Sequence, residues 1–187
     1  MPLTLAVITG STRPGRLGPL VAEWAADFAR ENSEFEIAPL DLADFALPLL
    51  DEAAHPSLKQ YEHEHTKRWS AAIEAADAFL FVTPEYDYFA PASLVNAVQC
   101  LSQEWNYKVA GILSYGGVSA GLRSTQTLRL LLSNVGVHTV KDTAAIQFIK
   151  THVNDGVFTA PEYAPEGLTK VLSELHKWSL AAAQLRD

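Results

Sequence analysis

The sequence predicts an α/β protein with a five-stranded, doubly wound parallel sheet and helices on both faces. Short continuous apolar runs recur along the chain, the first at residues 3–8, and such runs are typical of strands buried on both faces. Segments with helical apolar spacing separate them, and parallel strands need such crossover helices. With 187 residues, 48% of them hydrophobic, we expect a single domain over residues 1–187.

The first half of the chain begins with the strand at residues 3–8, which ends at Thr9 and Gly10. Spacings of three and four residues then predict an amphipathic helix. Residues 35–40 predict a second, weaker strand, and residues 41–65 a loop with some local helix. The apolar stripe of the helix consists of Leu17, Leu20, Val21, Trp24, Ala25 and Phe28.

The second half repeats the alternation. Strands are predicted at residues 78–83, 109–113 and 139–148, each preceded by a helical pattern, and a long helix closes the chain. Pro91 is expected in the first turn of the helix after the strand at residues 78–83. The apolar stripes of these helices are Trp69, Ala72, Ile73 and Ala76; Leu94, Ala97, Val98 and Leu101; Leu128, Leu131, Leu132 and Val135; and Leu168, Val171, Leu172, Leu175, Trp178 and Ala182.

This number of strands in a chain of this length favours the flavodoxin-like strand order 2-1-3-4-5. In open parallel sheets, ligands bind beyond the carboxyl ends of the strands, where the strand order reverses. The loops after the first, third and fourth strands are therefore the expected site.

The loop after the first strand has the features of a phosphate site. Residues 10–16, GSTRPGR, combine hydroxyl groups, the guanidinium groups of Arg13 and Arg16, and glycines that allow close backbone approach. The following helix start adds oriented N–H groups and a positive dipole end. The loop lacks the patterns of the nucleotide P-loop and of dinucleotide folds. An ordinary turn with exposed arginines is the alternative.

The other two loops suit a flat ring. Residues 83–91, TPEYDYFAP, place three aromatic residues between two prolines, and residues 114–117, SYGG, let backbone approach a ligand closely. The alternative is that Tyr86, Tyr88 and Phe89 pack under the loop or at a subunit contact.

Together, the segments GSTRPGR, TPEYD and SYGG at these spacings resemble the NADPH-dependent FMN reductase family, which includes quinone, azo and chromate reductases. The resemblance covers nearly the whole chain. Residues 47–49, 51–52, 76–78 and 96–97 and Trp69 also look like family positions.

The resemblance implies an FMN-dependent oxidoreductase with NADPH or NADH as electron donor. Electrons would pass by a ping-pong route to a small acceptor such as a quinone, an azo compound, free flavin or a metal ion. The flavin carries the chemistry, so no catalytic side chain is assigned. Members are typically homodimers or homotetramers. The implied FMN-binding residues are Ser11, Arg13, Arg16, Leu17, Gly18, Pro84, Glu85, Tyr86, Asp87, Tyr88, Ser114, Tyr115, Gly116 and Gly117.

The chain departs from the family pattern at a few positions. Asp87 stands where most members have Asn, so a carboxylate that only accepts hydrogen bonds would face the flavin ring. Val95 replaces a common Lys, and Gln103 with Glu104 stands where some members have Arg. These departures bear on flavin affinity and on contacts between subunits.

Two other functions stay open. A flavin-binding redox sensor or partner protein would hold FMN but turn over little. A serine hydrolase would use Ser119, because residues 117–121, GVSAG, match a nucleophile elbow and Asp142 and His152 follow in a suitable order. The strand here ends near Leu113, however, which places Ser119 beyond the turn where an elbow serine sits.

Two smaller signals favour structural roles. His63 and His65 suggest a metal site, but side chains two apart diverge on a helix, so a solvated charged face is the preferred interpretation. Cys100 lies beside an apolar stripe and is interpreted as a buried small hydrophobe.

Composition bears on partners and compartment. The net charge of −8 disfavours nucleic acid, because no excess of basic residues exists to displace counterions. A lone cysteine and an apolar start too short for a signal peptide or membrane span favour the cytoplasm. No membrane partner is expected.

Overall fold

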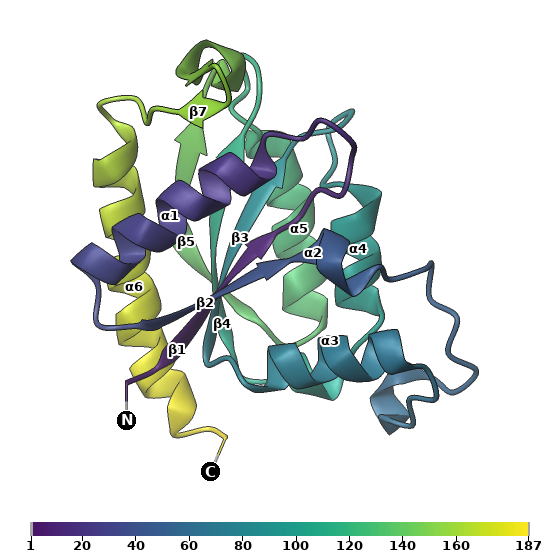
Figure 1. Ribbon diagram of the computed structural model, residues 1–187. Helices are drawn as coiled ribbons and strands as arrows, with labels where there is room; N and C mark the ends of the chain where they lie inside the picture. Colours follow the sequence, from purple (N-terminus) through teal and green to yellow (C-terminus); the bar gives the residue numbers. More distant parts are fainter. Residues whose placement is uncertain (1, 187) are drawn as a thin grey trace.

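A computed structural model describes residues 2–186 and confirms the predicted fold: a five-stranded parallel sheet in the order β2-β1-β3-β4-β5 (Figure 1). Every neighbouring pair of strands in this sheet is parallel. The strands are β1 (Thr4–Thr9), β2 (Glu36–Asp41), β3 (Ala78–Pro84), β4 (Val109–Tyr115) and β5 (His138–Ile146).

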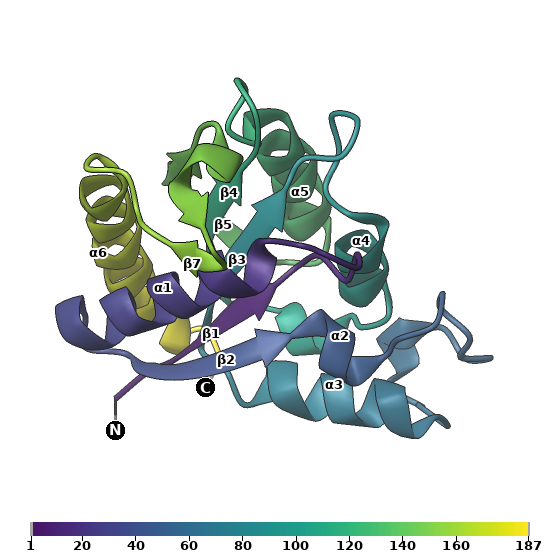
Figure 2. The same ribbon diagram turned by 45° about the horizontal axis from the view of Figure 1, so that its top comes forward.

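Helices cover both faces of the sheet (Figure 2). On one face lie α1 (Gly18–Asn32) and α6 (Ala164–Ala183), and on the other lie α3 (Glu64–Glu74), α4 (Ala92–Gln99) and α5 (Leu122–Asn134). The remaining elements are short: α2 (Leu42–Phe45), three 3₁₀ turns (Pro56–Leu58, Gln103–Trp105 and Ile149–His152), and a hairpin of β6 (Val153–Asn154) and β7 (Val157–Phe158). Among the described residues, no helix is long and apolar enough to cross a membrane.

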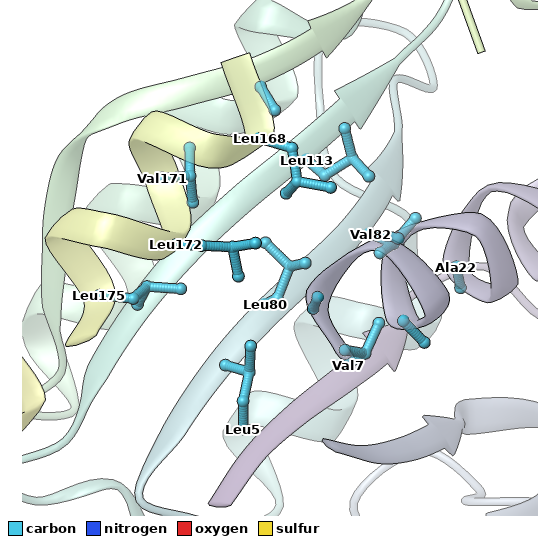
Figure 3. Close-up of a cluster of buried hydrophobic side chains, with 14 of the residues drawn as sticks. Leu5, Val7, Ala22, Leu80, Val82, Leu113, Leu168, Val171, Leu172 and Leu175 are labelled. Carbon is cyan, nitrogen blue, oxygen red and sulfur yellow. The ribbon is translucent and has the colours of Figure 1, made fainter. Parts of the chain in front are cut away.

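The sheet separates two hydrophobic clusters, because successive side chains of a strand point to opposite faces. Leu5 and Val7 of β1 contact the cluster under α1 and α6, which Figure 3 shows, whereas Ala6 and Ile8 belong to the cluster under α3, α4 and α5. Gly111 in β4 lets α6 approach, since a Cβ there would lie 2.5 Å from Val171 Cγ1.

The pairing of β4 with β5 shifts register between Ala110 and Ile112. Such a bulge leaves backbone groups of one strand without ladder partners. The Arg129 guanidinium of α5 satisfies them, since it donates to the carbonyl oxygens of Val140 at 2.6 Å and Lys141 at 3.0 Å. One half-buried cation therefore fixes the shape of β5.

The amino ends of the strands are held together by polar contacts. Asp77 accepts from the Thr4 backbone N–H at 2.9 Å and from Arg186 at 2.7 Å. Lys108 is buried nearby, and its Nζ donates to the carbonyl oxygens of Ile73 at 2.7 Å and Glu74 at 3.1 Å, at the end of α3. Burial lowers the pKa of Lys108 to about 8.

At the sheet edge, β2 carries Pro39 opposite Val7 of β1. Proline has no N–H to donate, so it is tolerated in a strand only where that donor would face away from the sheet. This position suits an outermost strand.

Some element boundaries differ from the predictions. The last strand ends at Ile146 and not at residue 148, because Phe148 adopts the left-handed conformation with φ 46°. Pro91 is the N-cap of α4 and lies just before its first turn, and Leu101 follows the helix. The β6–β7 hairpin was not predicted. Residues 41–65 contain α2, the first 3₁₀ turn and the start of α3, in keeping with a loop that has local helix.

Candidate functional site

Three loops meet at the carboxyl end of the sheet, because β1, β3 and β4 are neighbours. The Gly10 backbone N–H donates to the Val82 carbonyl oxygen at 2.9 Å, and Pro84 of β3 pairs with Tyr115 of β4. In Figure 1 the loop after β1 is the purple segment that leads into α1. The structure thus brings together the segments that sequence analysis singled out.

The loop after β1 leaves the start of α1 free for an anion. Leu17 is the N-cap, and its side chain makes no capping hydrogen bond. The first turn holds no acidic residue, and Pro19 stands at a position where a free N–H would otherwise need a partner. Gly15 takes the left-handed conformation with φ 70° and has open space around it. Both features suit a phosphate close to the backbone.

Polar side chains line the approach to this helix start. The hydroxyl groups of Ser11 and Tyr86 lie 2.8 Å apart, and Arg13 Nε donates to the Tyr86 hydroxyl at 3.2 Å. Ser11 is fully buried, whereas Arg13 is exposed. The contact joins the loop after β1 to the loop after β3.

Arg16 is held by β2. Its guanidinium donates to Asp41 Oδ2 at 2.7 Å, and its Nε is buried without a hydrogen-bond partner. A buried donor without a partner is costly, so it marks a place where an acceptor would be stabilising. Leu17 and Gly18 follow at the helix start.

The loop after β3 forms a tight turn. Tyr86 and Phe89 exchange backbone hydrogen bonds, both of 2.9 Å. Between them Asp87 and Tyr88 are both left-handed, with φ 48° and 75°. Tyr88 and Phe89 are each 60% exposed, so of the three aromatic residues only Tyr86 is partly covered. Of the two alternative placements, under the loop or at a subunit contact, only the second suits the exposed pair.

One residue that contacts this loop was not predicted from the sequence. Arg123, near the start of α5, donates from Nε to Glu85 Oε1 at 2.6 Å and from its backbone N–H to Glu85 Oε2 at 3.0 Å. Burial disfavours the charged form of Glu85, but the hydrogen bonds from Arg123 outweigh it and hold the pKa of Glu85 below its ordinary value. Glu85 and Arg123 are 38 positions apart in the sequence, so no helical or strand periodicity could have predicted their contact.

The loop after β4 contributes mainly backbone. Ser114 is fully buried, and its Oγ has no partner. Tyr115 is 4% exposed, burial raises its pKa, and a Cβ at Gly18 would lie 2.9 Å from its hydroxyl. Gly116 donates to the Ile146 carbonyl oxygen at 3.1 Å, and Gly117 is exposed with open space around it. Within residues 114–117, only Gly117 is exposed.

The hydrolase residues do not assemble. Asp142 lies in the middle of β5, roughly 13 Å before its carboxyl end at about 3.3 Å per residue. Ser119 lies in the loop before α5, and its hydroxyl is within hydrogen-bonding reach of Glu85. The predicted order of Ser119, Asp142 and His152 thus has no matching geometry.

The side chains of His63 and His65 do not diverge as the prediction assumed. The rings of His63 and His65 stack at 5.2 Å, because His63 is the extended N-cap of α3 and not part of the helix. His65 Nε2 lies 3.0 Å from Asp51 Oδ1. Within residues 2–186, no group of three or more suitable ligands could hold a metal ion. Cys100 is 3% exposed, as interpreted from the sequence, and burial raises its pKa to about 11.

Two of the positions that depart from the family pattern, Gln103 and Glu104, make contacts within the chain. Glu104 is buried and accepts from Ser70 at 2.6 Å and from Tyr61 at 3.2 Å, so it is not free for a contact between subunits. Gln103 donates to the Ser57 carbonyl oxygen at 2.6 Å. Val95 lies in an apolar groove between α4 and α5.

Comparison with known proteins decides the family. The model of the family described as NADPH-dependent FMN reductase matches residues 3–151. The chain belongs to this family. A protein of Schizosaccharomyces pombe named NAD(P)H-dependent FMN reductase is 41% identical over 63% of this chain and 60% of its own length. Another of that name from a Nectria species is 37% identical over 82% of each chain.

A solved structure supports the fold. The FerB flavoenzyme of Paracoccus denitrificans, an NAD(P)H:(acceptor) oxidoreductase, superposes with a TM-score of 0.74 over 96% of this chain and 98% of its own. The two sequences are 23% identical. The flavodoxin-like prediction is confirmed by this likeness and by the strand order.

Proposed function

We propose that this protein is an FMN-dependent NAD(P)H oxidoreductase that passes electrons to a small acceptor. Family membership supports the cofactor and the donor. The observation that carries the assignment is the start of α1, which has neither a side-chain cap nor an acidic residue in its first turn. A helix start of this kind beside Ser11, Arg13 and Arg16 suits a phosphate dianion.

The donor set around this helix start fits the FMN phosphate. Ser11 and Arg13 would bind it with the backbone of Leu17 and Gly18. Arg16 would add its buried Nε while Asp41 holds the guanidinium in place. The positive charges of Arg13 and Arg16 and several N–H groups would thus bind the phosphate together.

The other two loops would hold the ring. Backbone groups of residues 84–88, with the side chain of Tyr86, would contact one edge, and residues 114–117 would close on the other. Ser114 and Tyr115 are buried, so they would contact the flavin through their backbone groups and support the loop by packing. Open space at Gly117 suits a close approach by the ring. When bound, FMN supplies the capacity to accept a hydride and to give up its electrons to an acceptor.

The residues around the ring would set access to it. Tyr88 and Phe89 stand exposed at the rim of the site and offer flat apolar faces to a nicotinamide or an aromatic acceptor. A single open face would be used in turn by NAD(P)H and by the acceptor, which is a ping-pong order. Quinones, azo compounds, free flavin and metal ions are the candidate acceptors.

We also propose that the protein is a homodimer or homotetramer in the cytoplasm. An apolar groove between α4 and α5 is lined by Phe89, Val95, Leu130 and Leu131, and Leu130 is 77% exposed. Covering this groove with a second copy would remove apolar surface from water. Sedimentation equilibrium tests the assembly, and a monomer at micromolar concentration would contradict it.

The visible spectrum tests the proposed function. The protein is incubated with FMN, desalted and then mixed with NADPH without oxygen. Retained flavin absorbance that bleaches on addition of NADPH is the expected result. Retained flavin that does not bleach would favour a redox sensor or partner protein instead. Loss of all flavin on desalting would contradict the proposal and make Asp87 the first position to change, to Asn.

A further inference from the structure

One carboxylate ties the two loops that flank the proposed ring site. Glu85 belongs to the loop after β3, and its side chain is 7% exposed. It accepts from Arg123 Nε at 2.6 Å and from the Arg123 backbone N–H at 3.0 Å, and the Ser119 hydroxyl lies within reach. Ser119 and Arg123 flank the start of α5, directly after the loop at residues 114–117. Glu85 and Arg123, with Ser119, form what we call the latch.

Arg123 also holds the outer part of the turn. Its guanidinium lies 3.9 Å from the centre of the Tyr88 ring, a cation–π contact. Asp87 and Tyr88 are consecutive left-handed residues, and this conformation is unfavourable for residues other than glycine. The two hydrogen bonds between Tyr86 and Phe89 close this turn, and Arg123 adds contacts to Glu85 just before it and to Tyr88 within it.

We propose that Arg123 is a positioning residue for the flavin reaction. Through Glu85 and Tyr88 it fixes the separation and orientation of the two loops between which the ring would lie. The inference rests on the proposed function, because it requires the ring to occupy that place.

Backbone groups at the ring edges govern how tightly FMN binds and how easily it is reduced. A change at Arg123 would shift those groups without removing any group that touches the ring. Loosening the latch should therefore alter both flavin affinity and reduction potential. A pair that only stabilises the fold would alter neither.

The geometry of the pair favours the positioning role. The Arg123 guanidinium is 45% exposed, and partly exposed ion pairs add little to stability. Glu85, by contrast, is nearly enclosed and bound by two N–H groups of the same residue, which fixes direction as well as distance. The latch therefore orients the two loops and contributes little to the stability of the fold.

The test uses the full-length protein with Arg123→Gln, Arg123→Lys and Glu85→Gln. The matched control is Glu166→Gln, which breaks an exposed 2.7 Å ion pair with Lys170 on α6. Three quantities are measured for each protein: the FMN dissociation constant by quenching of flavin fluorescence, the midpoint potential of the bound flavin, and the melting temperature without flavin.

Arg123→Gln and Glu85→Gln should raise the dissociation constant about tenfold, because part of the binding free energy would be spent on realigning the two loops, and should shift the potential. Arg123→Lys keeps the charge and should recover part of the affinity. The control should match the wild type in affinity and potential. Melting temperatures without flavin should change little.

An unchanged potential and affinity in Arg123→Gln, with FMN bound normally by the wild type, would overturn the positioning role and leave the proposed function standing. A wild type that does not bind FMN would overturn the proposed function, and the positioning role with it.

Discussion

Lys108 should make the stability of the protein rise with pH. Its Nζ is buried beside the end of α3, and burial lowers its pKa from 10.5 to about 8. Between these values the unfolded chain binds the proton and the folded chain releases it, so unfolding becomes harder as pH rises. Below pH 8 both states are charged, and the full cost of burying the cation is present.

The size of the effect follows from the shift. Each unit of pKa is worth 1.36 kcal/mol, so the whole shift corresponds to about 3 kcal/mol, of which about 2 kcal/mol is recovered between pH 7 and 9.5. The nearby carboxylates of Asp77 and Glu74 oppose the shift, and Arg186 adds to it. Glu104 also opposes the shift, so burial lowers the pKa of Lys108 in spite of three facing carboxylates.

The assay compares urea unfolding of the wild type and Lys108→Met at pH 7 and 9.5. To a first approximation, the titration of every other group cancels in the comparison. Between pH 7 and 9.5 the free energy of unfolding of the wild type should therefore rise by about 2 kcal/mol more than that of the variant. The control is Lys170→Met, an exposed lysine on α6, which should show no such gain. Parallel pH profiles for the wild type and Lys108→Met would refute the reasoning.

Three further predictions concern the site and the core. Arg13→Ala should raise the FMN dissociation constant about tenfold, because a contact with the phosphate is lost. An unchanged value in equilibrium dialysis would refute the proposal that the loop after β1 binds the phosphate. Gly111→Ala should destabilise by about 1–3 kcal/mol, because the new Cβ would meet Val171 at 2.5 Å; an unchanged melting temperature would contradict this. Arg129→Met should cost about 2 kcal/mol in urea unfolding by leaving carbonyl groups of β5 unpaired, whereas Arg30→Met, in an exposed pair, should cost under about 0.5 kcal/mol.

The sequence predicts the sheet well because its strands are read from local pattern. Residues 5–8 and 78–82 are apolar without interruption, which is typical of a strand buried on both faces. The order of strands follows from crossover rules and chain length. The hairpin at residues 153–158 escaped prediction, since strands of two residues carry no alternation to detect.

The three loops that the sequence singled out lie together at one end of the sheet, but the contacts among them could not be predicted. Glycines and arginines after the first strand indicated where a phosphate would bind. The pairing of Arg16 with Asp41 and of Glu85 with Arg123 depends on three-dimensional placement, which spacing does not encode. The stacking of His63 on His65 was missed because it depends on where α3 begins.

The proline at the outer edge of β2 has a consequence for how copies of this protein can meet. A strand from another molecule that docks along β2 would find no donor at Pro39, so a continuous sheet across two molecules is disfavoured there. The self-association proposed above would instead use a helical face, such as the groove between α4 and α5. The same missing donor guards against aggregation by strand addition while the chain is concentrated or partly unfolded.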